Sequence, residues 1–231
     1  MSSPGSDRVN AALADFGAVV AHRASLRLDD AWLAMSSVLT PTLDVAFWRA
    51  SLDALARECP MPTRAGVIDH LFGSGRLRGA RDDYGDWRNS QIDHVLSNGV
   101  GIPISLAVTA MVVARRIGVE LAGVGMPAHF LIGDPADGNW FVDPFGGGQV
   151  LDRIGGRDLF RRITGGAATW REDFLRPTPP AAIVVRMLNN LRASFARDND
   201  QIRLALVMRM RAMVTSADST DDTRRAQAAF N

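Results

Sequence analysis

The chain has 231 residues, and its 26 arginines, 25 acidic residues and absent lysines give a formal net charge of +1. This length suits one large domain or two small ones, and 47% hydrophobic with 22% charged residues is typical of a soluble globular protein. The balanced charge argues against nucleic acid or an anionic membrane as a partner. The absence of lysine excludes a lysine nucleophile or Schiff base.

The single cysteine, Cys59, excludes an intrachain disulfide framework and a cysteine-rich zinc site. The four histidines have no metal-ligand spacing, so we expect neither a metal nor a cofactor. The start of the chain has no apolar signal segment, and the longest nearly apolar run, residues 101–114, is too short to cross a bilayer. We therefore expect a cytoplasmic protein that binds no membrane. The sequence does not determine its oligomeric state.

The N-terminal part of the chain predicts helices after a small, polar start at residues 1–8 that we expect to be disordered. These helices are expected over residues 10–20 and 28–38, from residue 45 to just before Cys59, and over residues 63–72. Pro60 and Pro62 separate the last two, because proline lacks a backbone donor and restricts its neighbour. A glycine-rich, charged loop is expected over residues 73–88, and such loops often hold functional groups.

The rest of the chain mixes helices with short strands. Helices are expected over residues 89–98, from Pro103, within 156–174, and over 181–197 and 201–214. Strands are expected over residues 121–124, 130–132 and 140–142, with Asp137-Gly138 as the turn between the last two. The last two helices predict a hairpin, followed by a frayed tail at residues 216–231. The pattern predicts an α+β fold in three segments, 1–88, 89–176 and 177–231, forming one compact unit.

His129 and Asp143 form the candidate functional pair. They are 14 residues apart with a turn between them, and a hairpin would place them side by side. Asp143 would then accept the imidazole N–H and fix the tautomer of His129. A cysteine at a helix N-terminus would complete a nucleophilic site, because the helix dipole lowers the thiol pKa. Taken alone, a core histidine and a strand-end turn aspartate are the ordinary interpretations.

Several short motifs occur in a fixed order within residues 27–214. They are Asn89-Ser90, Gly101-Ile102-Pro103-Ile104-Ser105-Leu106, Pro127-Ala128-His129-Phe130-Leu131 and Asp143-Pro144-Phe145-Gly146-Gly147-Gly148. Together they resemble the SirB-type branch of the transglutaminase-like superfamily. The resemblance implies a papain-like core, in which one helix packs on a small antiparallel sheet, with N-terminal helices and a C-terminal helical hairpin.

In catalytic members of that superfamily, a cysteine at the helix start attacks an amide carbonyl, a histidine acts as base and an aspartate orients it. The resemblance assigns the last two roles to His129 and Asp143. It places the cysteine slot at or near Pro103, where proline suits the first helical position but cannot act as a nucleophile.

The missing thiol leaves three interpretations open. In the first, which we favour, a degenerate and non-catalytic cleft binds a peptide or protein. Its candidate binding residues are Asn89, Ser90, Pro103 and Trp87. In the second, Ser105 or Ser90 replaces the thiol in an amide-bond hydrolase or acyltransferase, although serines at helix starts commonly cap the helix. In the third, Cys59 reaches the site from the N-terminal helices.

Two other roles remain open from the sequence. Arg81, Arg88 and Arg115 can each clamp a carboxylate or phosphate, although surface ion pairs with nearby aspartates are their ordinary role. Residues 181–214 carry an apolar stripe that would suit a helical scaffold, and such a stripe ordinarily packs on the protein's own core.

Overall fold

The chain forms two compact units. The computed structural model describes the backbone of residues 4–229 and the side chains of residues 5–216. The first unit contains residues 1–45 and 180–231, and the second contains residues 46–179. These boundaries differ from the three segments expected from the sequence, because helices from both ends of the chain contact one another.

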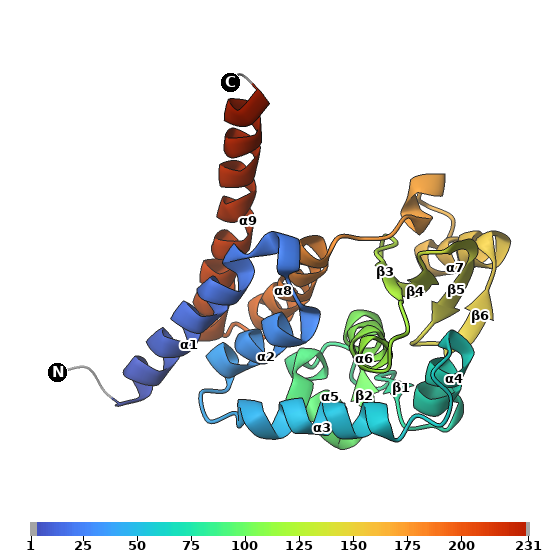
Figure 1. Ribbon diagram of the computed structural model, residues 1–231, viewed down its shortest axis with the longest axis horizontal. Coiled ribbons are helices and arrows are strands. Elements are labelled where there is room, and N and C mark those ends of the chain that lie inside the picture. The colour runs from blue at the N-terminus through green and yellow to red at the C-terminus, as the bar shows by residue number, and fades with distance from the viewer. Residues whose placement is uncertain (1–3, 230–231) are drawn as a thin grey trace. The chain divides into compact units, whose positions relative to one another are not determined.

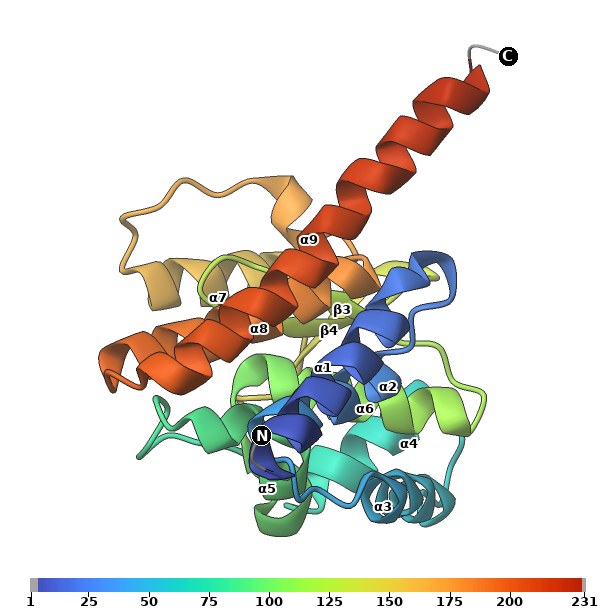
Figure 2. The same cartoon turned by 90° about the vertical axis from the view of Figure 1, so that its left-hand side faces the viewer.

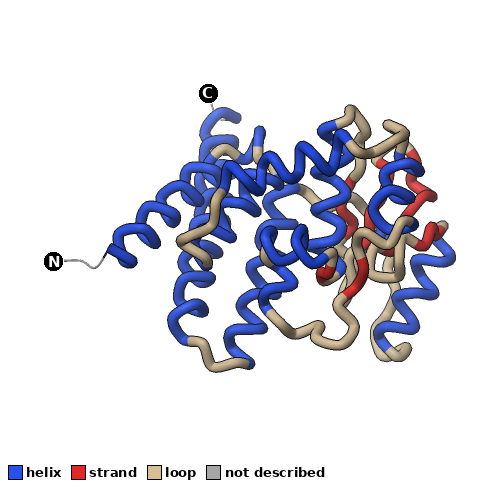
Figure 3. The backbone as a smooth tube through the Cα atoms, turned by 90° about the horizontal axis from the view of Figure 1, so that it is seen from below, coloured by secondary structure: helices blue, strands red, loops and turns tan. Residues whose placement is uncertain are grey.

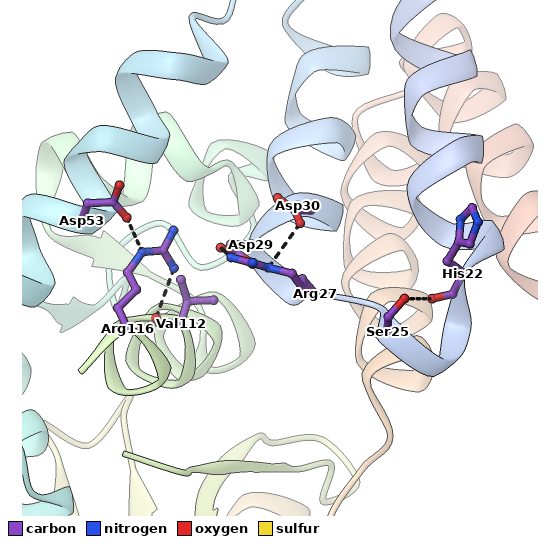
Figure 4. A network of polar contacts seen from close by, with 8 residues as sticks. All are labelled: His22, Ser25, Arg27, Asp29, Asp30, Asp53, Val112 and Arg116. Atoms are coloured by element: carbon purple, nitrogen blue, oxygen red, sulfur yellow. Dashed lines mark hydrogen bonds and ion pairs between the residues drawn. The ribbon is translucent and has the colours of Figure 1, made fainter. Parts of the chain in front are cut away.

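All regular secondary structure in the described residues of the first unit is helical. Its elements are α1 (Pro4–Ala21), the 3-10 turn η1 (Arg23–Ser25), α2 (Leu28–Leu39), α8 (Pro180–Arg197) and α9 (Gln201–Ala229) (Figure 1). α9 runs along α8 and also contacts α1 (Figure 2). At the start of α2, Arg27 forms ion pairs of 3.2 and 3.3 Å with Asp29 and Asp30 (Figure 4). Both carboxylates also suit the positive end of the helix dipole.

The two terminal helices are longer than the sequence predicts. α1 begins at Pro4 where a disordered start was expected, since proline is favoured at the first helical position. α9 continues through Ala229 where a frayed tail was expected, because its residues include neither proline nor glycine to end the helix. Residues 1–3 and 230–231 of those predictions lie outside the described residues.

The second unit is built around α6 (Pro103–Arg116), which is buried on nearly all sides. Its other helical elements are α3 (Val45–Arg57), α4 (Arg64–Ile68), the π-helical turn η2 (Asp69–Gly73), η3 (Trp87–Ser90), α5 (Ile92–Asn98), α7 (Arg153–Thr164) and η4 (Glu172–Leu175). Arg116 at the end of α6 pairs with Asp53 of α3 at 2.6 Å, and its Nη1 donates to the Val112 carbonyl (Figure 4). These contacts fix the C-terminal end of the central helix.

A four-stranded antiparallel sheet completes the second unit. Its strands are β3 (Ala122–Val124), β4 (Leu131–Asp134), β5 (Asp137–Asp143) and β6 (Gln149–Leu151), in that spatial order. Figure 3 shows the strands in red. One face of the sheet buries Leu131 and Phe141 in a cluster with Phe160 of α7, and α6 contacts β3 and β4. The fold is therefore α+β, mostly helical with a small antiparallel sheet.

The sheet corrects two details of the sequence prediction. The turn between β4 and β5 is formed by residues 135 and 136, not by Asp137-Gly138. Proline favours the first turn position, and Asp134 Oδ1 accepts the N–H of Ala136 at 2.8 Å. β6 was not predicted, because a three-residue strand after three glycines shows no alternation.

A second, two-stranded parallel sheet lies within the predicted loop region and just before α6. β1 (Arg78–Gly79) pairs with β2 (Val100–Gly101). A side chain at Gly79 would bring its Cβ within 2.7 Å of the Phe145 ring, so glycine is required for this close approach. The strand pair thus fixes part of the charged loop beside the start of α6.

Candidate functional site

The structure brings His129 and Asp143 together at one end of the β4–β5 hairpin. His129 Nε2 lies 2.8 Å from Asp143 Oδ1, and the two residues are only 7% and 5% exposed. Asp143 ends β5 as predicted. His129 precedes β4 rather than lying on a strand, because a turn closed by its own N–H to the Met126 carbonyl interrupts the strand pairing.

The surroundings of Asp143 favour its ionised form. Burial alone would raise the pKa of this carboxyl. The hydrogen bond and charge of His129, with backbone N–H groups of Gly146 and Phe145, outweigh burial and hold the pKa below its usual value. An ionised Asp143 accepts the Nε2–H of His129, so the proton of this bond lies on Nε2. The pair is therefore arranged as a histidine oriented by a carboxylate.

The start of α6 contains two of the candidate residues, Pro103 and Ser105. Pro103 is the first helical residue and is buried. The Ser105 hydroxyl, with no exposed surface, donates to the Asn89 carbonyl at 2.7 Å and accepts the Ile102 N–H at 3.1 Å. Asn89 in turn donates from its side-chain Nδ2 to the Asp83 carbonyl at 2.7 Å. These bonds tie η3 and the charged loop to the first turn of α6.

The remaining candidate residues lie in η3, after α3 and in the last turn of α6. Ser90 is buried in η3 beside Asn89, and Trp87 begins η3 with a partly exposed side chain. Cys59 follows α3, and its Sγ donates to the Met61 carbonyl at 3.3 Å. Arg88 forms the expected surface ion pair with Asp86 at 2.6 Å. Arg115 is exposed in the last turn of α6.

Phe145 connects the histidine pair to the region before α6, and sequence reasoning gave it no role. Its ring lies edge-on to the His129 ring with centroids 6.3 Å apart, and its N–H donates to Asp143 Oδ1 at 3.0 Å. The same ring packs against Gly79. Gly79 pairs with Gly101 in the sheet formed by β1 and β2, and Gly101 lies two residues before α6. The position of Phe145 directly after Asp143-Pro144 is the only sequence signal for this contact.

Ala128, immediately before His129, has a left-handed backbone with φ of 62°. This conformation costs a residue with a Cβ about 1–2 kcal/mol. Ala128→Gly should therefore raise the free energy of unfolding by about 0.5–1 kcal/mol, after the greater freedom of glycine in the unfolded chain is subtracted. Urea denaturation measures the change. Ala136→Gly, in an ordinary turn conformation, should lower stability, and an equal loss in both variants would contradict the prediction.

The fold and the site together define an α+β protein with a histidine–carboxylate pair at the end of a small antiparallel sheet. The mostly buried helix α6 of the same unit begins at Pro103. Residues 40–189 match the family model of the transglutaminase-like superfamily. The chain therefore belongs to this superfamily.

Curated relatives agree with this assignment. A UPF0162 protein of Vibrio cholerae is 35% identical over 197 residues, which cover 79% of this chain and 71% of the relative. A UPF0162 protein of Xylella fastidiosa (strain 9a5c) is 40% identical over 145 residues, which cover 61% of this chain. The chain spans about half of the Xylella protein, 52% of its length.

A shorter match reaches a eukaryotic protein. F-box only protein 21 of Mus musculus is 39% identical over 62 residues, 27% of this chain and 10% of the F-box protein. No solved structure matched the chain. Within residues 4–229, no helix is long and apolar enough to span a bilayer.

Proposed function

We propose that this chain is a non-catalytic, SirB-type transglutaminase-like protein with a papain-like core. It binds a peptide or protein partner at a degenerate site around His129 and Asp143. The observation that supports the proposal is that α6 begins at Pro103, and the family resemblance puts the nucleophile at or near this residue. Proline has no group that can attack a carbonyl, so the site retains the orienting pair without its reaction partner.

The position of Ser105 supports this function over hydrolysis or acyl transfer by a serine. A serine nucleophile needs its hydroxyl within hydrogen-bond reach of the base. The Ser105 hydroxyl instead donates to the backbone of Asn89 and is fully buried. The hydroxyl proton is committed to this structural bond, and a general base would have to accept that proton before the oxygen could attack a carbonyl carbon.

The retained pair suits recognition of a peptide. Asp143 holds His129 in one tautomer, so the imidazole presents a defined hydrogen-bonding pattern to an amide group. The formal charge of +1 supports a peptide or protein partner over nucleic acid. A cytoplasmic location follows from the same proposal, since the single cysteine suits a reducing compartment.

The test titrates 15N-labelled protein with twenty N-acetyl peptide amides of the form Ala-Ala-X-Ala-Ala. We expect at least one peptide to shift amide resonances around His129 and Asp143 and to keep its mass on long incubation. His129→Ala should weaken that binding about tenfold, in line with the loss of one hydrogen bond of about 1–1.5 kcal/mol. His22→Ala, at an exposed histidine of the first unit, is the matched control.

Three outcomes would contradict this function. They are peptide cleavage or acyl transfer by the wild type, equal binding to wild type and His129→Ala, and no binding by any peptide of the panel. His129→Gln retains an N–H donor toward Asp143 and replaces the alanine variant if the latter does not fold.

A further inference from the structure

Arg81 is an exposed cation next to the histidine pair, and no described carboxylate pairs with it. Its guanidinium lies 5.5 Å from the centroid of the Phe145 ring, and Nη2 is 3.5 Å from the Phe145 carbonyl oxygen. Two other arginines near this loop are neutralised by carboxylates. Arg76 pairs with Glu58 at 2.9 Å and Arg88 with Asp86 at 2.6 Å. Arg81 therefore has donors left for an external anion.

Phe145 determines where this cation lies. Its ring is edge-on to His129, its N–H is bonded to Asp143, and the absence of a side chain at Gly79 gives the ring its place. Contacts on three sides therefore hold the ring. Arg81 stacks on a positioned surface, one aromatic ring away from His129, and the cation–π contact reduces the freedom it must lose on binding.

Tyr84 adds an exposed aromatic surface to the same place. Its ring lies edge-on to Phe145 with centroids 5.7 Å apart, and the side chain is 51% exposed. The loop that carries Arg81 and Tyr84 is anchored at the Asp83 carbonyl by Asn89, whose own carbonyl is bonded to Ser105. The cation and the aromatic ring thus come from one segment that is tied to the start of α6.

We infer that Arg81, Phe145 and Tyr84 form a subsite beside His129 that binds the carboxylate of a peptide ligand. This inference rests on the proposed function and specifies the chemistry of its ligand. A guanidinium binds a carboxylate through two parallel N–H···O bonds, and the neighbouring rings contact the apolar part of the peptide. Asp82 and Asp83 follow Arg81, but both are exposed, so water and salt screen their repulsion.

The carboxylate can belong to a peptide C-terminus or to an acidic side chain, and three N-acetyl peptides distinguish these sources. They are Ala-Ala-Leu-Ala-Ala as the free acid, the same sequence as the amide, and Ala-Ala-Glu-Ala-Ala as the amide. We expect the free acid, the glutamate peptide or both to bind wild type about tenfold more tightly than the leucine amide. The peptide that shows the preference identifies the source.

Arg81→Gln should abolish that preference and leave the binding of the leucine amide unchanged. Arg81→Lys should recover only part of it, because an ammonium lacks the planar fork of donors. The matched control is Arg78→Gln, which removes the same charge from an exposed arginine on β1 and should retain the preference. Raising the salt concentration should weaken the two carboxylate peptides more than the leucine amide.

Equal binding of all three peptides by wild type would overturn the subsite, as would equal loss of the preference in Arg81→Gln and Arg78→Gln. If wild type binds all three peptides equally and His129→Ala weakens this binding, the proposed function stands and only this inference fails. If none of the three peptides and none of the earlier panel binds, both fail.

Discussion

Asp143→Ala should lower the free energy of unfolding by about 3–5 kcal/mol, the range expected when one partner of a buried pair is removed. The change leaves His129 Nε2 and the N–H groups of Phe145 and Gly146 without their acceptor. Asp143→Asn retains an oxygen acceptor and should cost less. Urea denaturation measures both. Asp137→Ala, at the exposed end of the same strand, is the control and should change stability by less than about 1 kcal/mol.

The same carboxylate predicts a pH dependence. The pKa of Asp143 is lower in the folded protein than in the unfolded chain, because the bonds from His129 and the backbone outweigh burial. Its ionised form therefore stabilises the fold above the unfolded pKa, and this contribution is lost as pH falls through the folded pKa. Between about pH 5 and pH 2, wild type should lose stability more steeply than Asp143→Asn. If the free energies of unfolding of wild type and Asp143→Asn fell in parallel over this pH range, the result would contradict the lowered pKa of Asp143.

Ser105→Ala should lower the free energy of unfolding by about 2–3 kcal/mol. The hydroxyl donates to Asn89 and accepts from Ile102, and its removal leaves two buried backbone groups without a partner. Ser51→Ala is the matched control. The Ser51 hydroxyl bonds only to a carbonyl of its own helix, one turn away, so the change should stay within about 0.5 kcal/mol.

A second measurement on Ser105→Ala separates a structural from a chemical role. Wild type and variant should react equally, and only at background level, with a fluorophosphonate that labels activated serines. Strong labelling of wild type that disappears in Ser105→Ala, with stability unchanged, would show instead that Ser105 is a nucleophile.

The elements with long or regular patterns were predictable from the sequence. The apolar run that begins at Pro103 gives the central helix, and the short apolar segments between residues 121 and 142, separated by turn residues, give three strands. The spacing of His129 and Asp143 places them at one end of a hairpin, and the hydrogen bond between them agrees. These features depend on local periodicity, which one sequence displays directly.

The features that escaped prediction depend on contacts distant in the sequence or on backbone conformation. β1 and β2 have two residues each and exist only because Arg78 and Gly79 pair with residues 100 and 101. The role of the Ser105 hydroxyl is set by a carbonyl 16 residues earlier. The left-handed backbone of Ala128 has no signal at all, because alanine seldom adopts it. The subsite around Phe145 likewise forms only after the chain has folded.

The division of the chain also has a consequence for biosynthesis. The first unit joins residues 1–45 to residues 180–231, and Arg23 donates a hydrogen bond to the carbonyl of Val214 across that separation. During translation, residues 46–179 are complete before α8 and α9 exist. The second unit can therefore fold while α1 and α2 still lack the surfaces on which they pack. α1 and α2 are therefore translated before the second unit, but they are buried only after α8 and α9 have been made.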